Sequence, residues 1–215
     1  MTELVFILDR SGSMAGLEAD PIGGVTSMLA KQRATPGEAV VSTVLFDHET
    51  QVIHDRVPLK EVKDLTREDY YVRGCTALLD AVGGAIHHIG NVHKYARKED
   101  VPEKTLFIIT TDGMENASKR YDYRKVKEMI ERQKDKYGWE LIFLGANIDA
   151  AREAARFGIG EDKAVTYRSD SVGTRLNYDV IADAVADYRR AAPCCKSVSS
   201  GWKKRIDEDM RKRGK

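Results

Sequence analysis

Residues able to bind a metal ion follow directly after an apolar run near the amino terminus. Asp9, Ser11 and Ser13 come right after the run at residues 4–8, so one carboxylate and two hydroxyls fall on a tight turn. Hard divalent cations prefer oxygen ligands, and Mg²⁺ in particular takes few carboxylates and keeps several waters. The turn therefore predicts a site for a divalent cation.

Two more oxygen donors occur where a folded sheet would bring them to the same edge. Thr76 lies just before an expected helix, and Asp112 follows the apolar run at residues 106–109. The alternative is that residues 11–13 form only a helix-capping turn, with Asp9 accepting hydrogen bonds from backbone amides. The coincidence of three such segments argues against that alternative.

Apolar runs of strand length alternate with segments of helical periodicity, and these elements must position the oxygen donors. The runs rich in Val, Ile, Leu and Phe predict strands at residues 4–8, 40–46, 106–109, 141–144 and 164–167. The helical spacing of apolar residues predicts helices that begin near residue 20 and then cover residues 78–89, 126–130, 149–157 and 171–190.

One further strand, at residues 51–57, mixes apolar and polar side chains and follows the strand at residues 40–46 after a short polar loop. A connection this short implies an antiparallel hairpin. We therefore expect an α/β fold with a doubly wound, mostly parallel central sheet, one antiparallel edge strand and helices on both faces. In such folds ligands bind beyond the carboxyl ends of the strands, where the oxygen donors fall.

Three segments that carry these donors stand in order along the chain: D-x-S-x-S at residues 9–13, Gly74-Cys75-Thr76-Ala77-Leu78, and Thr111-Asp112-Gly113. Together they resemble the von Willebrand factor A (vWA) domain and its metal-ion-dependent adhesion site, over about residues 1–190. The resemblance implies that Ser11, Ser13 and Thr76 coordinate the metal directly, while Asp9 and Asp112 act mostly through water. It also implies one coordination position left open for an Asp or Glu side chain of a protein partner.

The expected function is therefore that of a protein-binding module and not of an enzyme. Mg²⁺, or Mn²⁺, which accepts the same oxygen ligands, would bridge the chain to an acidic residue of a protein partner within a cytosolic assembly. If Asp112 moves between direct and water-mediated contact with the metal ion when the partner binds, the helix at residues 171–190 is the element expected to shift.

An enzyme is the first alternative, because haloacid-dehalogenase-like phosphatases also place an Asp after the first strand beside Mg²⁺. Those enzymes need a second Asp two residues later, and Ser11 occupies that position, which disfavours a metal-dependent phosphoesterase. A nucleotide-binding Rossmann domain is disfavoured as well, since neither glycine-rich phosphate-binding motif occurs.

Composition limits the remaining classes. The 215 residues are 42% hydrophobic, and 35 basic against 34 acidic residues leave a net charge of +1, which excludes wholesale disorder and gives no general argument for nucleic-acid binding. We expect a vWA-like domain at residues 1–192 and a basic tail at residues 193–215. The tail is interpreted as solvated or frayed, and a nucleic-acid-associated function through the tail, with Trp202 beside the basic cluster, is the alternative.

The location expected from the sequence is cytoplasmic, with no membrane partner. The longest apolar run near the start is far too short for a membrane-spanning helix or a signal-peptide core. Three cysteines, two of them adjacent, form a poor disulfide framework and favour reduced thiols.

Several residues near the expected site receive plainer interpretations. Arg10 is expected to point to solvent, with contact to the incoming carboxylate as the alternative. Cys75 is expected to pack, and Glu115 to adjust the rim or supply another oxygen. The histidines at positions 87, 88 and 93 share one predicted helix, but their offsets do not place two rings on one face as a zinc pair requires.

Overall fold

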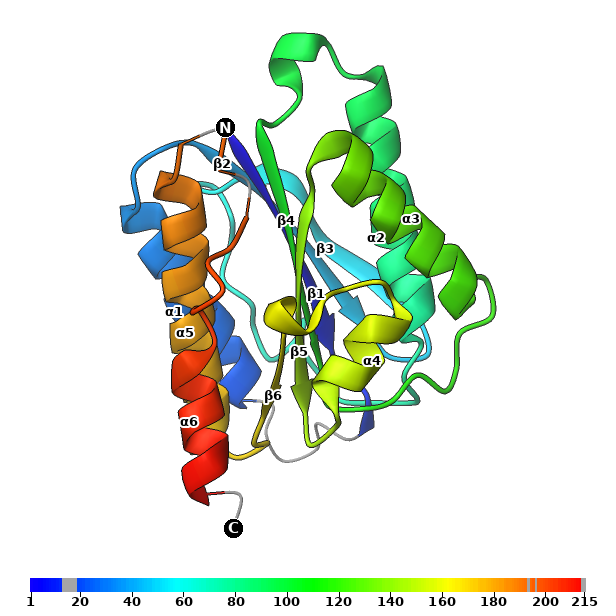
Figure 1. Ribbon diagram of the computed structural model, residues 1–215, viewed down its shortest axis with the longest axis vertical. Helices are drawn as coiled ribbons and strands as arrows, with labels where there is room; N and C mark the ends of the chain where they lie inside the picture. The colour runs from blue at the N-terminus through cyan, green and yellow to red at the C-terminus, as the bar shows by residue number, and fades with distance from the viewer. Residues whose placement is uncertain (13–18, 193, 196, 214–215) are drawn as a thin grey trace.

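The computed structural model describes residues 1–12, 19–192, 194–195 and 197–213, and its centre is a six-stranded sheet with helices on both faces (Figure 1). The strand order is β3-β2-β1-β4-β5-β6. The strands are β1 (Thr2–Asp9), β2 (Ala39–Phe46), β3 (Thr50–Pro58), β4 (Lys104–Thr111), β5 (Glu140–Ala146) and β6 (Ala164–Tyr167). All neighbouring strands are parallel except β2 and β3.

The predicted fold class is confirmed, and the burial of the strands explains the apolar and mixed sequence patterns that predicted it. Every residue of β1 and β4 is buried, because helices cover both faces of the central strands. The edge strand β3 is mostly exposed or half-buried, which is why its sequence mixes polar and apolar side chains. The hairpin that joins β2 and β3 is antiparallel, as the short loop predicts.

Two apolar cores lie on opposite faces of the sheet. One face packs against α1 (Ala19–Ala34) and α5 (Ser171–Arg190). The other packs against α2 (Leu78–Tyr95), α3 (Tyr123–Tyr137) and α4 (Ala150–Arg156). The helix α4 ends as predicted, because Gly158 adopts a left-handed backbone with φ of 78° just beyond it.

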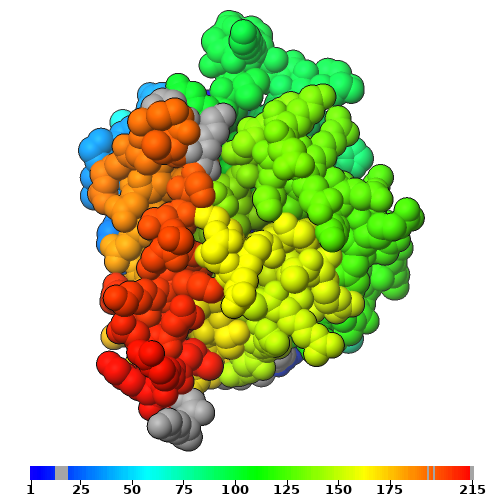
Figure 2. All heavy atoms as spheres, viewed as in Figure 1, coloured from blue at the N-terminus to red at the C-terminus, as the bar shows by residue number. Residues whose placement is uncertain are grey.

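The carboxyl-terminal segment differs from the expectation of a solvated tail. The helix α6 (Lys204–Arg213) packs beside α5, and Figure 2 shows the two as an orange-to-red ridge along one edge. Trp202 and Ile206 are buried in the core beneath this ridge, and the Trp202 indole donates a hydrogen bond to the carbonyl of Asp162 at 2.9 Å. The expectation of a solvated tail is therefore wrong for residues 197–213, because Trp202 and Ile206 are buried in the core and hold this charged segment against it. The boundary at residue 192 stays a prediction.

In the parts of the chain that the structure describes, no helix combines the length and the hydropathy of a membrane span.

Candidate functional site

The candidate site begins where β1 and β4 end side by side. Because the two strands are parallel neighbours, Asp9 at the end of β1 lies against the backbone that follows β4. One carboxylate oxygen of Asp9 accepts hydrogen bonds from the hydroxyl of Thr111 at 2.7 Å and from the amide of Asp112 at 3.2 Å. The other oxygen accepts from the amide of Ser11 at 2.7 Å. Asp9 thus fixes both loops that carry predicted ligands.

Thr76 reaches the same point from the loop before α2. Its hydroxyl donates a hydrogen bond to the hydroxyl oxygen of Ser11 at 3.1 Å. Two backbone hydrogen bonds hold the loops together, from Gly12 to Gly74 at 3.1 Å and from Arg73 to Arg10 at 3.0 Å. The structure therefore brings together two of the three hydroxyls that the sequence predicts as direct ligands.

Asp112 completes the group that the structure describes. Its carboxylate accepts hydrogen bonds from the side-chain amide of Asn147 at 3.3 Å and from the hydroxyl of Ser169 at 2.9 Å. Sequence reasoning did not identify these two residues, although Asn147 directly follows β5 and Ser169 comes two residues after β6, so both stand at the same edge of the sheet. The remaining predicted ligand, Ser13, lies outside the described residues.

Both carboxylates of the site are buried without a compensating cation. Burial raises the pKa of Asp9, although hydrogen bonds from Ser11 and Thr111 act in the opposite direction. Burial also raises the pKa of Asp112, and the nearby charge of Asp9 adds to the increase. Among the described residues, neither carboxylate forms an ion pair. The site therefore carries negative charge, and only neutral groups hold it.

Arg10 does not point to solvent, so that expectation is wrong. Its side chain is only 1% exposed, and its Nε donates to the carboxylate of Asp47 at 2.9 Å. Its Nη1 donates to the side chain of Gln51 at 2.7 Å. Successive side chains of an extended chain point to opposite sides, so Arg10 turns away from Asp9 and also does not face an incoming carboxylate.

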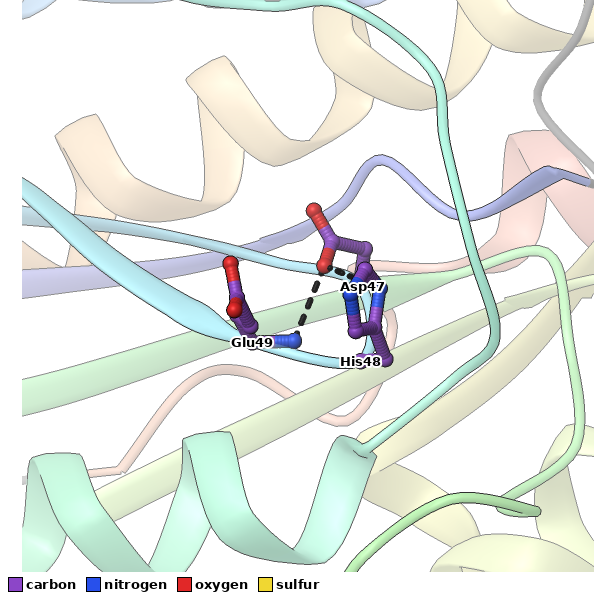
Figure 3. Close-up of side chains that lie close together, drawn as sticks. All are labelled: Asp47, His48 and Glu49. Atoms are coloured by element: carbon purple, nitrogen blue, oxygen red, sulfur yellow. Dashed lines mark hydrogen bonds and ion pairs between the residues drawn. The ribbon is translucent and has the colours of Figure 1, made fainter.

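A second cluster of possible metal ligands lies on the turn between β2 and β3. Figure 3 shows Asp47, His48 and Glu49 close together, with ligand atoms within 4.8 Å of one another. The carboxylate of Asp47 is already fully engaged, because one oxygen accepts from the amide of Glu49 and lies 2.9 Å from the His48 ring. Its other oxygen accepts from Arg10 and from Nε of Arg73, the latter at 3.0 Å.

The pKa of Asp47 reflects these contacts. Burial opposes ionisation, but the hydrogen bonds from Glu49, Arg73 and Arg10 together lower the pKa of this carboxyl below its ordinary value. A metal ion bound through Oδ1 of Asp47 would compete with the amide of Glu49, and two guanidinium groups already compensate the charge of the carboxylate on Oδ2. The cluster is therefore a structural anchor, and its backbone carbonyl at Asp47 also accepts from the amide of Ala77, next to the Thr76 loop.

The residues after Asp112 serve the backbone of α2 instead of supplying further oxygens to the site. Glu115 accepts hydrogen bonds from the amides of Leu79 and Ser118, and Asn116 accepts from the amide of Thr76. Because Ala77 provides no side-chain cap, Glu115 satisfies the first turn of α2 from outside, and Asn116 binds the amide of Thr76 just before the helix. They thereby hold the Thr76 loop in place.

Other sequence interpretations have mixed outcomes. Cys75 is exposed, so its expected packing role is wrong. The three histidines of α2 have three different partners: His87 lies 3.3 Å from the hydroxyl of Tyr121, His88 pairs with Asp55, and His93 pairs with Glu3.

Comparison with known proteins identifies the fold. No family model matches the sequence, and neither does any curated protein. Among solved structures, the vWF domain of the type V pili tip protein Mfa5 from Porphyromonas gingivalis is similar, with a TM-score of 0.62, 12% identity, and coverage of 89% of this chain and 97% of that one. The pilus adhesin SpaC from Lactobacillus rhamnosus GG matches with a TM-score of 0.63, 11% identity and coverage of 87% and 30%.

A von Willebrand factor type A protein from Catenulispora acidiphila is also similar, with a TM-score of 0.57 and 12% identity over 86% of this chain and 42% of that protein. The chain thus spans less than half of two of these three relatives and nearly all of the third. The strand order, the antiparallel edge strand and these matches agree, and the chain has the fold of a von Willebrand factor A domain.

Proposed function

We propose that this chain is a metal-dependent protein-binding module, in which Mg²⁺ or Mn²⁺ bridges the chain to an acidic residue of a protein partner. Ser11, Ser13 and Thr76 would hold the ion directly, and Asp9 and Asp112 would hold it through water. The observation that carries the proposal is the pair of buried carboxylates that form no ion pair with a described residue, next to the hydroxyls of Ser11 and Thr76 at 3.1 Å from each other.

The donor set fits a hard divalent cation. All its functional atoms are carboxylate or hydroxyl oxygens, which such cations prefer over nitrogen and sulfur. Buried negative charge that only neutral groups hold is costly, and a cation relieves that cost. When bound, the ion supplies a positive centre that accepts a carboxylate oxygen from the partner.

The residues of the chain have separate tasks in this proposal. Asp9 fixes the Ser11 turn and the Asp112 backbone through its two oxygens. Asn147 and Ser169 hold the carboxylate of Asp112 from two other loops. Arg10 is engaged with Asp47, so its positive charge does not compete with the metal for the site.

The similar structures support a role in protein interaction. They include a pilus tip protein and a pilus adhesin, and such domains are typically binding modules and not enzymes. An acidic side chain as the partner's contribution, and a cytosolic assembly as the setting, belong to the proposal.

The test is isothermal titration of Mg²⁺ and Mn²⁺ into the wild type and into a Ser11→Ala/Ser13→Ala variant. Wild type should bind the metal, and its melting temperature should rise by mass action. The serine variant should show neither effect. A Ser27→Ala/Ser200→Ala variant, which removes two exposed serines far from the site in sequence, is the matched control and should behave as wild type. Equal binding by wild type and the Ser11/Ser13 variant would contradict the proposal.

A peptide array tests the partner chemistry. Peptides that carry one Asp or Glu among neutral residues should be retained in Mg²⁺ and released by a chelator. Replacement of that residue by Asn or Gln should abolish retention, because an amide brings no negative charge to the metal. Retention that ignores both the chelator and the amide replacement would argue against metal bridging.

A further inference from the structure

A groove of about 770 Å³ lies between α2 and α3, which run side by side on the same face of the sheet (Figure 1). Its walls are the carboxyl-terminal halves of the two helices, together with residues 101–103 before β4 and Trp139 before β5. Because β4 and β5 begin here, the groove lies at the opposite end of the sheet from the candidate metal site. It is therefore separate from the site described above.

The floor of the groove is apolar and rigid. Ile86, Met129 and Trp139 line it, and the Trp139 indole stacks on Phe107 with the ring centres 5.2 Å apart. Gly90 also lines the groove, and a Cβ atom at this position would lie 3.2 Å from the side-chain amide nitrogen of Gln133 and 4.0 Å from Trp139, so a larger side chain here would crowd the groove. A helix-interior glycine costs about 0.5–1 kcal/mol relative to alanine.

The rim of the groove is strongly basic. Lys94, Lys98, Arg132 and Lys136 line it, and Glu103 is the only acidic residue among the described lining residues. Glu103 already pairs with the amino group of Met1 at 3.8 Å. In the described parts of the chain, none of the four rim cations forms an ion pair with a carboxylate.

The opposite side of α3 provides an internal contrast. Arg124 and Lys127 do not line the groove, and each lies 3.8 Å from a glutamate one turn later, Glu128 and Glu131 respectively. Such pairs at a spacing of four residues are the ordinary way in which an exposed helix balances its charges. Arg124 and Lys127 thus have acidic partners, whereas Arg132 and Lys136 on the groove side have none among the described residues.

We propose that this groove binds an amphipathic acidic segment of a protein partner. Apolar side chains of the segment would pack on Tyr137, which is exposed, and on Met129, which is half-buried, and its carboxylates would pair with the four rim cations. Helix-in-groove recognition uses an apolar floor for affinity and charged edges for orientation. Nucleic acid fits less well, because the chain carries a net charge of only +1.

The test uses a fluorescein-labelled 18-residue peptide with Leu at every third or fourth position and Glu elsewhere, followed by fluorescence anisotropy. A chelator is present throughout, so metal-dependent capture of carboxylates cannot contribute, and failure here leaves the proposed function untouched. Wild type should bind saturably, and Arg132→Glu/Lys136→Glu should weaken binding by about tenfold or more. The control Arg124→Glu/Lys125→Glu has the same charge change on the same helix and should bind within about twofold of wild type.

A second variant tests the floor without any change of charge. Gly90→Leu crowds the groove and should weaken binding to a similar degree, while Gly90→Ala should retain most of it. Circular dichroism establishes that each variant is folded. Equal weakening by the two charge-reversal variants, full binding by Gly90→Leu, or equal binding of a peptide with Leu replaced by Ser would overturn the proposal. Tighter binding of a single-stranded oligonucleotide of the same charge would overturn it as well.

Discussion

Two buried aspartates at neighbouring strand ends have opposite electrostatic environments. Asp9 ends β1, and Asp47 directly follows the end of the adjacent β2. Asp47 accepts hydrogen bonds from two guanidinium groups, and its pKa is lowered. Asp9 accepts from hydroxyls and amides and forms no ion pair within the described residues, and burial raises its pKa. The two carboxylates therefore differ in the charge that faces them and not in their burial, because Asp47 faces two guanidinium groups and Asp9 forms no ion pair within the described residues.

Arg10 forms an ion pair with Asp47 and not with Asp9. Arg10 is adjacent to Asp9 in the sequence, yet it crosses to the neighbouring strand end and neutralises Asp47. Tyr71 covers this arrangement, with the guanidinium of Arg10 4.8 Å from its ring centre. The result is one aspartate with a charge partner beside another that forms no ion pair within the described residues, and the proposed metal ion would compensate the charge of the second.

The largest expected effect is a difference in the free energy of unfolding lost when Asp47 or Asp9 is replaced by Asn. Asp47→Asn leaves the buried guanidinium of Arg10 without its counter-charge, and loss of one partner of such a pair costs about 3–5 kcal/mol. Asp9→Asn, measured in chelator, should cost only about 1 kcal/mol, because it weakens neutral hydrogen bonds and removes an unfavourable charge. Urea unfolding of both variants measures the difference.

A third variant shows whether the stability lost in Asp47→Asn comes from the buried ion pair with Arg10. Glu49→Gln removes the exposed partner of Arg73 and should cost less than about 1 kcal/mol. Equal losses for Asp47→Asn and Asp9→Asn would show that the two carboxylates are held alike, and the comparison would fail.

The next effect concerns metal binding itself. Mg²⁺ at 100 times its dissociation constant should raise the free energy of unfolding of wild type by about 2.7 kcal/mol. Asp9→Asn should lose this stabilisation. His48→Ala/Glu49→Ala should keep it, because Asp47 and its neighbours serve as an anchor and not as ligands. Thermal unfolding with and without Mg²⁺ decides between the two clusters, and stabilisation lost only in the His48/Glu49 variant would reverse their roles.

The sequence revealed the elements and part of the site because those signals are local. Apolar runs predicted the buried strands, and three short segments predicted that Asp9, Thr76 and Asp112 meet at one edge of the sheet. The partner of Arg10 was not predicted, since it lies 37 residues away and nothing near Arg10 indicates which carboxylate it will reach. Residues that follow parallel strands meet at one edge of the sheet, and this rule places Asp112 beside Asp9. It places Asp47 at the same edge, because Asp47 directly follows β2, so the rule alone does not tell which aspartates share a site.

The carboxyl-terminal segment was misjudged for a different physical reason. Its many charges predicted a solvated tail, but charges on one side of a helix say little about the other side. Trp202 and Ile206 supply the apolar contacts that bind the segment to the core. Apolar residues within a charged run are thus the signal that predicts a docked helix.

A smaller effect is a pH dependence of opposite sign for the two aspartates. The raised pKa of Asp9 contributes stability that is present below the ordinary value of 3.8 and is lost as pH rises through the folded-state pKa. The lowered pKa of Asp47 contributes stability that is present above 3.8 and is lost as pH falls through its folded-state pKa.

Unfolding in chelator across this pH range tests both signs. As pH falls, wild type should gain stability relative to Asp9→Asn and should lose stability relative to Asp47→Asn, by at most about 1.4 kcal/mol per pH unit for each group. Saturating Mg²⁺ should abolish the first trend, because the ion replaces the proton as the compensating charge. Parallel trends for the two variants would contradict the comparison.

The smallest effect distinguishes two adjacent threonines of β4. The hydroxyl of Thr110 is buried, and no hydrogen-bond partner for it occurs in the described parts of the chain, so Thr110→Val should stabilise the protein by up to about 1 kcal/mol. The hydroxyl of Thr111 donates to Asp9, so Thr111→Val should destabilise it by a similar amount and also weaken Mg²⁺ binding. Titration of Mg²⁺ into the Thr110 variant should match wild type. If both substitutions weakened metal binding equally, the hydrogen bond to Asp9 would not be what prepares that carboxylate for the ion.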